Sequence, residues 1–198
     1  MDSNLNYKTK ILDAALHEFG SKGYPLASTN TIAKAACVSK GIIFKYFQTK
    51  ADLFYSVYMR ELDGFIDAFR VFQLKAKKDI FEQIIDIILW KSLYTREHPD
   101  SANVLLEGIA NPPKEIAAKF YDSIDRLRET SMQSLFSSLK FEHLREGITP
   151  EKVEKTLNIA MSGLQATYVN KNTSFKDLEA IREESIEFLK IIIRGLEN

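Results

Sequence analysis

Apolar positions recur at spacings of three and four along most of the chain, a period that predicts an all-α fold. A first helix is predicted over residues 7–22, and Gly20, Gly23 and Pro25 predict its end. The inward face of this helix is formed by Ile11, Leu12, Ala15, Leu16 and Phe19. Because no segment alternates like a strand or carries an Asn-Gly hairpin, we expect about nine helices and no sheet.

The stretch Ser28–Phe47 predicts two short helices joined by a tight turn. We expect the Ser28 hydroxyl to cap the first of them and Ser39 to cap the second. Four side chains are predicted on the outer surface of the second helix, namely Lys40, Ile42, Lys45 and Tyr46. Two lysines, a tyrosine and an isoleucine facing water are unusual on a supporting helix, and they fit a surface that contacts DNA.

Longer helices follow this segment. Thr49 is the predicted N-cap of a fourth helix that reaches about residue 74. A broad apolar arc over residues 79–98 predicts a central helix, and Asp100 or Ser101 is expected to cap the short helix after it. The remaining predicted helices span about 114–139, 150–168 and 175–196, the second of them with Thr149 as N-cap and Pro150 at its first position.

Charge is distributed unevenly between the two ends of this neutral chain. Residues 1–50 hold seven lysines and three acidic residues, a net charge of +4, which leaves 20 basic and 24 acidic residues, or −4, for the rest. A basic N-terminal region on an acidic body is typical of a DNA-contacting domain attached to a domain that does not contact DNA.

Cys37 is the only cysteine, so no intramolecular disulfide can form, which suits a reducing compartment. The N-terminus lacks an apolar signal region, and no run reaches the roughly 18 apolar residues of a membrane span. We therefore expect a cytoplasmic protein with no membrane partner.

Two stretches carry a resemblance to a known family. Residues 32–54, IAKAACVSKGIIFKYFQTKADLF, and residues 11–24, ILDAALHEFGSKGY, resemble the helix-turn-helix region of tetracycline-repressor-type (TetR-family) transcriptional regulators. The sequence departs from the family at Cys37, where glycine is usual, and at Phe44, where tyrosine is usual.

The resemblance implies a three-helix DNA-binding domain over residues 1–47 and a helical effector-binding and dimerisation domain over residues 48–198. It implies a ligand-responsive regulator, a repressor, that binds a palindromic operator in double-stranded DNA as a homodimer. The effector would be small and largely apolar. An activator, or a regulator without a ligand, fits the same sequence.

The DNA-contacting residues that the resemblance implies surround the predicted turn. They are Ser28, Thr29, Thr31, Ser39, Lys40, Gly41, Ile42, Phe44, Lys45, Tyr46 and Lys50. Ile42 would contact a thymine methyl, and Tyr46 and Lys50 would contact phosphates. The alternative is that Ile42 packs against a neighbouring helix and that the lysines are simply solvated.

Two apolar sets are assigned to the body. The candidate effector pocket consists of Phe65, Phe69, Trp90, Tyr94, Phe120 and Met161. The candidate dimer interface, on the last two helices, consists of Leu157, Met161, Leu164, Tyr168, Leu178, Ile181, Phe188 and Ile192. For each pocket residue taken singly, a plain core position is the favoured interpretation, and the alternative for the interface set is that it only closes the core of the monomer. Asp86 fits a solvated polar stripe better than an anchor for a cationic ligand.

Signatures of catalysis are absent from the sequence. It has no Gly-rich phosphate loop, His-Glu-x-x-His or Gly-x-Ser-x-Gly motif, and its three histidines lie far apart. We expect no catalytic residues, no metal ligands and no cofactor. A helical small-molecule-binding protein or enzyme without specific DNA binding is the alternative from another class.

Overall fold

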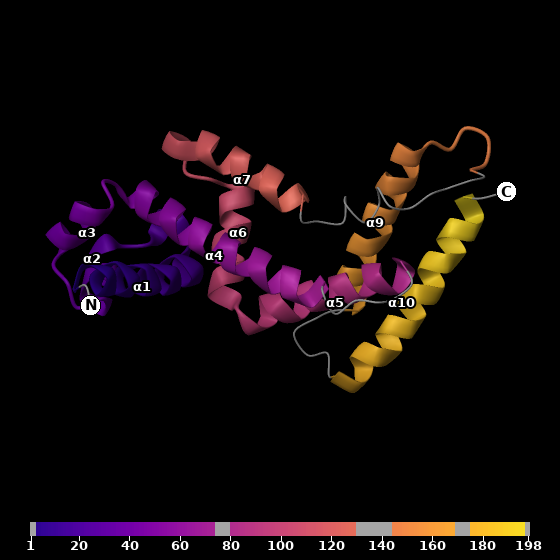
Figure 1. The fold of residues 1–198 in the computed structure, drawn as a ribbon, viewed down its shortest axis with the longest axis horizontal. Coiled ribbons are helices and arrows are strands. Elements are labelled where there is room, and N and C mark those ends of the chain that lie inside the picture. The colour runs from indigo at the N-terminus through magenta and orange to yellow at the C-terminus, as the bar shows by residue number, and fades with distance from the viewer. Residues whose placement is uncertain (1–2, 74–79, 130–143, 169–174, 197–198) are drawn as a thin grey trace. The chain divides into compact units, whose positions relative to one another are not determined.

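The computed structural model describes residues 3–73, 80–129, 144–168 and 175–196 (Figure 1). These ranges hold nine α-helices and one 3-10 helix and no strand, which confirms the predicted all-α fold. Over the same ranges, no helix combines the length and hydropathy needed to cross a membrane.

The helices fall into two compact units. Unit 1 covers Met1–Gln73 and His98–Leu127, and unit 2 covers Leu74–Glu97 and Arg128–Asn198. Unit 1 contains α1 (Ser3–Leu26), α2 (Thr29–Ala35), α3 (Lys40–Tyr46), α4 (Lys50–Gln73), α6 (Pro99–Ala110), η1 (Lys114–Ile116) and most of α7 (Ala117–Glu129). Unit 2 contains α5 (Ile80–Glu97), α9 (Pro150–Tyr168) and α10 (Phe175–Leu196). The functional boundary predicted at residue 47 stays a prediction.

The end of α1 is set by glycine, as the sequence predicts. Gly23 adopts a left-handed backbone conformation with φ 74° and ψ 162°, which interrupts the helix. One further turn follows, in which the Ala27 N–H donates to the Gly23 carbonyl (3.1 Å), so that the helical region extends to Leu26.

The last regular turn of α1 lies directly against α6. A Cβ on Gly20 would stand 2.5 Å from the Cα of Asp100, so only glycine permits this approach. The Asn103 side-chain amide donates to the Gly20 carbonyl (2.9 Å). Because α6 begins at Pro99 with His98 at the N-cap, the expected cap at Asp100 or Ser101 is wrong. Proline at the first helical position lacks only an N–H that has no partner within the helix.

The core of unit 1 is rich in aromatic rings. Phe54 contacts Phe19 at a centroid distance of 5.0 Å and Phe120 at 5.9 Å, and all three side chains are fully buried. Tyr58 lies 4.8 Å from Phe120, and its hydroxyl is 2.9 Å from the Ser123 hydroxyl. Each such ring contributes about 1.5–3 kcal/mol when it is removed from water. The core therefore joins α1 and α4 to α7, across a gap in sequence that no local pattern indicates.

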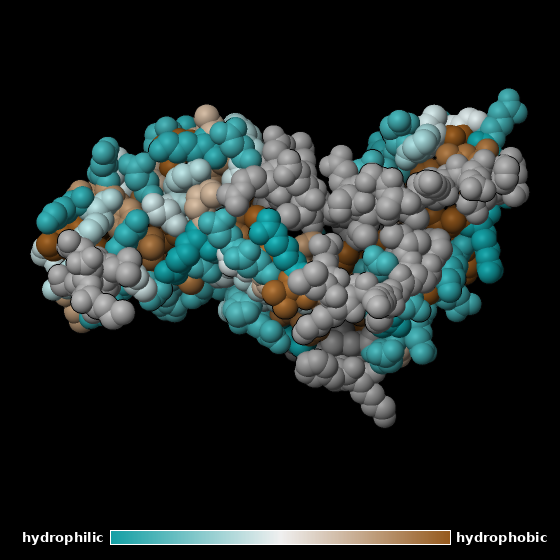
Figure 2. Space-filling view, in the orientation of Figure 1, coloured by the Kyte–Doolittle hydropathy of each residue, from teal (hydrophilic) through white to brown (hydrophobic). Residues whose placement is uncertain are grey.

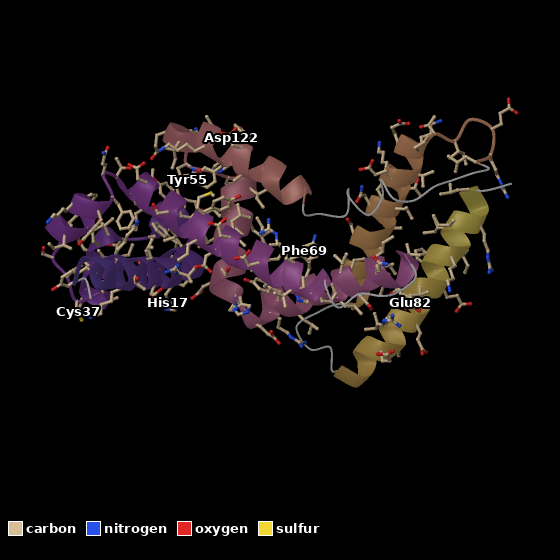
Figure 3. All side chains as sticks on the ribbon, in the orientation of Figure 1. His17, Cys37, Tyr55, Phe69, Glu82 and Asp122 are labelled. Atoms are coloured by element: carbon tan, nitrogen blue, oxygen red, sulfur yellow. The ribbon has the colours of Figure 1, made fainter. Side chains whose placement is uncertain are left out.

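Unit 2 is held by apolar contacts and by a half-buried ion network. Isoleucines of α5 and leucines of α9 and α10 are buried within it, among them Ile84, Ile85, Leu157 and Leu189. Arg182 of α10 donates to Asp86 of α5 (Nε to Oδ1, 2.6 Å) and lies 3.4 Å from Glu82, which Figure 3 labels. Asp86 is thus a partner of an arginine, and the interpretation of it as part of a solvated stripe is wrong.

The turn between α2 and α3 is built by backbone hydrogen bonds. The Val38 N–H donates to the Ala33 carbonyl (3.0 Å) and the Cys37 N–H to the Lys34 carbonyl (3.2 Å), a Schellman arrangement. This arrangement needs a left-handed residue after the cap, and Cys37 takes that conformation with φ 55°. Figure 3 labels Cys37. Cys37 thus occupies a position that favours glycine.

We expect Cys37→Gly to raise the free energy of unfolding by about 0.5–1 kcal/mol, because glycine takes the left-handed conformation without a Cβ clash. Urea unfolding at pH 7 measures the change. Cys37→Ser is the matched control, since it keeps the Cβ and removes the thiol. An equal gain in both variants would contradict the backbone explanation.

Candidate nucleic-acid interface

The exposed side of α3 is narrower than the sequence predicts. Lys40, Gly41, Phe44 and Lys45 are exposed, whereas Ile42 and Tyr46 are half-buried and pack against the core of unit 1. The prediction that Ile42 faces water is therefore wrong. Ile43 and Phe47 are buried, as predicted, and they fix the helix on the core.

Phe44 is the large apolar side chain that α3 exposes, at 38% of its surface. The Lys40 ammonium lies 5.9 Å from the centroid of its ring. Figure 2 shows hydrophobic and hydrophilic residues next to one another at this end of unit 1. Ser39 caps the helix through its hydroxyl, which accepts from the Ile42 N–H (3.4 Å), and this confirms the predicted cap.

The start of α2 is stabilised differently from the prediction. Ser28 occupies the N-cap position, but its side chain makes no capping hydrogen bond. Instead, the Ser28 N–H donates to the carboxylate of Glu18 (3.0 Å), a residue of α1. Ser28 and Thr29 are half-buried, and Thr31 and Ser39 are exposed.

Glu18 is a buried carboxylate that the sequence analysis did not single out. It is 5% exposed and also accepts from the Lys22 ammonium (2.9 Å). Burial alone would raise the pKa of Glu18, but the hydrogen bonds from Lys22 and the Ser28 N–H outweigh it and hold the pKa below its usual value. Its only sequence signal is the four-residue spacing to Lys22.

Lys50, at the first position of α4, is half-buried among groups of unit 1. Its ammonium donates to the Pro25 carbonyl (3.3 Å) and lies 4.7 Å from the centroid of the Tyr24 ring. Burial lowers the pKa of Lys50, against the opposing charges of Glu107, Glu115 and Glu18. The predicted phosphate-contacting lysine is therefore under the electrostatic influence of three protein carboxylates.

Tyr24 connects this lysine to α6 and η1. Its N–H donates to Glu107 (2.8 Å) and its hydroxyl to Glu115 (2.8 Å). Burial, together with the hydrogen bond to the Glu115 carboxylate, raises the pKa of Tyr24 to about 12. We call Tyr24, Lys50, Glu107 and Glu115 the Tyr24 cluster.

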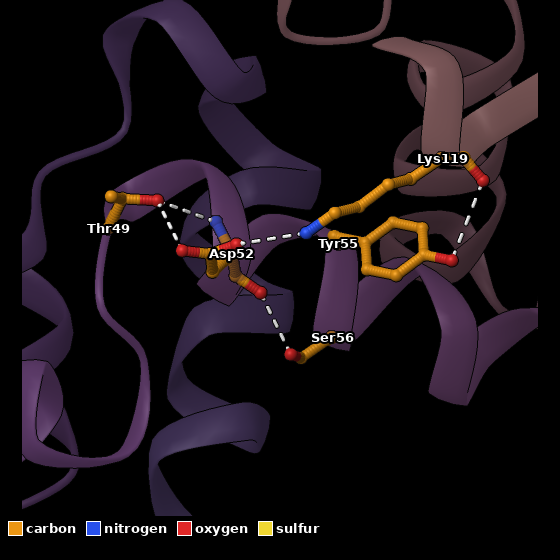
Figure 4. A network of polar contacts seen from close by, with 5 residues as sticks. All are labelled: Thr49, Asp52, Tyr55, Ser56 and Lys119. Atoms are coloured by element: carbon orange, nitrogen blue, oxygen red, sulfur yellow. Dashed lines mark hydrogen bonds and ion pairs between the residues drawn. The ribbon is translucent and has the colours of Figure 1, made fainter. Parts of the chain in front are cut away.

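The first turn of α4 has a second polar network (Figure 4). Thr49 accepts from the Asp52 N–H (3.0 Å) and donates to the Asp52 carboxylate (2.8 Å), which confirms the predicted N-cap. Lys119 of α7 lies 3.4 Å from the other Asp52 oxygen, and its carbonyl accepts from the Tyr55 hydroxyl at 3.5 Å. The hydrogen bond from Thr49 is the main reason that the pKa of Asp52 is lowered.

The candidate effector residues are divided between the two units. Phe65, Phe69 and Phe120 belong to unit 1, and Trp90 and Tyr94 belong to unit 2, 5.3 Å apart between ring centroids. Met161 lies outside the described side chains. Phe120 is fully buried against Phe54 and Tyr58, which favours a core role for this residue. The pocket itself stays a prediction.

The candidate interface residues on α9 and α10 differ in exposure. Leu157 and Leu164 are buried, Ile181 and Ile192 are half-buried, and Phe188 is 43% exposed. Met161, Tyr168 and Leu178 lie outside the described side chains.

Histidines and acidic residues of the described ranges do not gather into a metal site. His17 forms a hydrogen bond with Asp100 of α6 (Nδ1 to Oδ2, 2.8 Å). This contact adds to the attachment of α1 to α6.

A short helix with an exposed basic and aromatic side, held by a tight turn on a three-helix core, has the geometry of a helix-turn-helix. Residues 11–57 match the family described as bacterial regulatory proteins, tetR family. The predicted TetR resemblance is thereby confirmed, and this region is a tetR-family helix-turn-helix.

The similarity to known proteins extends over nearly the whole chain. The fatty acid metabolism regulator protein of Bacillus subtilis (strain 168) is 23% identical over 190 residues, which cover 96% of this chain and 95% of that protein. The structure of the transcriptional regulator FadR from Bacillus subtilis in complex with stearoyl-CoA has a TM-score of 0.63 at 21% identity, covering 91% of this chain and 96% of that one. The structure of AibR in complex with isovaleryl coenzyme A and operator DNA has a TM-score of 0.67 at 17% identity, covering 92% and 97%.

We expect Glu18→Gln to lower the free energy of unfolding at pH 7 by about 1–3 kcal/mol, because two hydrogen bonds to a charged acceptor are weakened. The folded-state pKa of Glu18 is lowered, so its contribution is complete above the unfolded value of about 4.3 and is lost as the pH falls through the folded value. The stability difference between variant and wild type should therefore shrink in acid. Urea unfolding at pH 7 and pH 3 measures it, with exposed Asp122→Asn as control. A difference that is the same at both pH values would argue against this role.

Proposed function

We propose that this protein is a ligand-responsive transcriptional repressor that binds a palindromic operator as a homodimer. The observation that carries the proposal is the exposed side of α3, where Lys40, Phe44 and Lys45 face outward from a helix that Ser39 caps and Ile43 anchors. In this proposal residues 1–47 contact DNA, and residues 48–198 bind the effector and the second protomer.

The recognition helix would lie in the major groove, with its lysines near phosphates. The sequence predicts that Ile42 contacts a thymine methyl, but its half-buried position reduces the side-chain surface that a base could contact. Phe44 is the better candidate for that contact because its exposed ring can pack against a methyl group. The residues that we still propose to contact the DNA backbone are Thr29, Thr31, Ser39, Gly41 and Tyr46.

The effector class is suggested by the compared proteins. The Bacillus subtilis relative regulates fatty acid metabolism, and the two structures hold stearoyl-CoA and isovaleryl coenzyme A. We propose that an acyl-CoA thioester releases this protein from DNA. The acyl chain of such a thioester would supply the apolar part of the effector that the aromatic residues of the body predict.

Exposed apolar residues on α9 and α10 support a homodimer. Ile159, Phe188 and Ile191 are 64%, 43% and 58% exposed. On α9, Ile159 shares a face with the small exposed residues Gly163 and Ala166, at spacings of four and seven. Since Leu157 and Leu164 are buried within the unit, we propose that this outer face forms the interface. Two protomers would place two recognition helices about 34–36 Å apart, one turn of the duplex.

We expect a selected duplex to bind with an affinity that falls as salt rises, with a slope near −0.9 per phosphate contacted. The site is first selected from random duplexes, and fluorescence anisotropy then measures the affinity from 50 to 300 mM salt. Lys40→Gln and Lys45→Gln should each reduce the magnitude of the slope by the value of about one phosphate contact. Lys190→Gln, at an exposed position about 100° from Ile191 around α10, should leave the slope unchanged.

Stearoyl-CoA added to the same titration should release the DNA, and free coenzyme A, which lacks the acyl chain, should not. A slope near zero in the wild type would contradict phosphate contact, and with it the proposed function.

We expect Ile191→Lys to convert the dimer into a monomer, because a charge in the centre of an apolar interface is costly to desolvate. Sedimentation equilibrium at micromolar concentration measures the mass. Glu183→Lys, at an exposed position of the same helix that does not share the face of Phe188 and Ile191, is the control for added charge. A wild type that sediments as a monomer would refute the proposed dimer.

A further inference from the structure

The Tyr24 cluster places a predicted DNA-contacting lysine beside two carboxylates from a distant part of the sequence. Glu107 lies on α6 and Glu115 on η1, and both contact Tyr24 at 2.8 Å. Lys50 lies on the face of the same ring, with its ammonium 4.7 Å from the centroid. All four residues belong to unit 1.

The cluster is tightly fitted around the break in α1. A Cβ on Gly23 would stand 3.4 Å from a carboxylate oxygen of Glu107, so this carboxylate follows the backbone of Gly23 and Tyr24 closely. The Tyr24 ring is packed against Phe19 and Phe54, at centroid distances of 6.1 and 5.2 Å. Tyr24 therefore has little freedom, and it presents a fixed surface to Lys50.

We propose that the Lys50 ammonium has two alternative partners, the Tyr24 cluster in the free protein and a DNA phosphate in the complex, so that Glu107 and Glu115 are positioning residues that limit the affinity for DNA. The proposal rests on the proposed function and adds to it the groups that compete with DNA.

The Tyr24 cluster and a DNA phosphate compete for Lys50 because its single ammonium group cannot lie beside both. The ammonium has three donors, but moving toward a phosphate takes it away from the Tyr24 ring and the Pro25 carbonyl. A lysine on an aromatic face is attracted electrostatically to the ring, and nearby carboxylates add to the attraction. The carboxylates also repel an incoming phosphate, since charges within about 10 Å interact at 0.1 M salt.

Glu107 and Glu115 belong to a segment, residues 99–116, that also forms hydrogen bonds with α1. Asn103 and Asp100 of α6 bind the Gly20 carbonyl and His17, at 2.9 and 2.8 Å. A shift of this segment would therefore change the position of α1 and the partners of Lys50 together.

The test is a double-mutant cycle on the full-length protein with the selected duplex. Glu115→Gln, Lys50→Met and the double variant are titrated by anisotropy at 100 and 200 mM salt. We expect Glu115→Gln to raise the affinity about two- to fivefold, because it removes the attraction between one carboxylate and the Lys50 ammonium. Lys50→Met should reduce the salt slope by about 0.9. In the Lys50→Met background, Glu115→Gln should lose most of its effect.

Two controls separate this competition from a general loss of negative charge. Asp122→Asn, an exposed carboxylate of α7 outside the cluster, should change the affinity less than Glu115→Gln. Glu107→Gln, which keeps an acceptor for the Tyr24 N–H, should act in the same direction as Glu115→Gln. It replaces that variant if thermal unfolding shows that Glu115→Gln is not folded.

The proposal is overturned if Glu115→Gln tightens binding equally with and without Lys50, or if Lys50→Met leaves the salt slope unchanged. Either result is compatible with a wild type that binds DNA in a salt-dependent manner. A wild type that binds no selected duplex would instead refute the proposed function, so the two failures are distinguishable.

Discussion

The hydrogen bond from the Tyr24 N–H to Glu107 is the interaction on which the arrangement of unit 1 depends. It satisfies a backbone group at the point where Gly23 interrupts α1, and its acceptor comes from 83 residues further along the chain. The absence of a Cβ at Gly20 lets α6 approach closely enough for this contact. The end of α1 and the position of α6 are therefore determined together.

This constraint explains why the three N-terminal helices are not an independent module in the structure. Unit 1 includes His98–Leu127 as well as the N-terminal helices, and its aromatic core joins Phe19 and Phe54 to Phe120. Lys50, one of the basic residues among the first 50, likewise interacts electrostatically with carboxylates of α6 and η1. Groups far from Lys50 in sequence thus shape the electrostatic field around it.

Local patterns predicted the features that depend on neighbouring residues. The caps at Ser39 and Thr49 follow from a hydroxyl three residues before an N–H, and the structure contains both. Ser28 has the same local signal, but its hydroxyl makes no capping hydrogen bond. Its own N–H instead donates to Glu18, a buried carboxylate of α1 that also accepts from Lys22. A competing partner from another helix cannot be read from a capping pattern.

The sequence by itself determined the helical class, the turn between two short helices and the TetR resemblance, because periodicity, caps and motifs involve residues within a few positions of one another. Only the tertiary structure decided that Ile42 is half-buried while Phe44 is exposed, and that Asp86 pairs with Arg182. These outcomes depend on which distant helix packs against each side chain. Helical period leaves that choice open, since each residue at the edge of an apolar stripe can face either a neighbour or water.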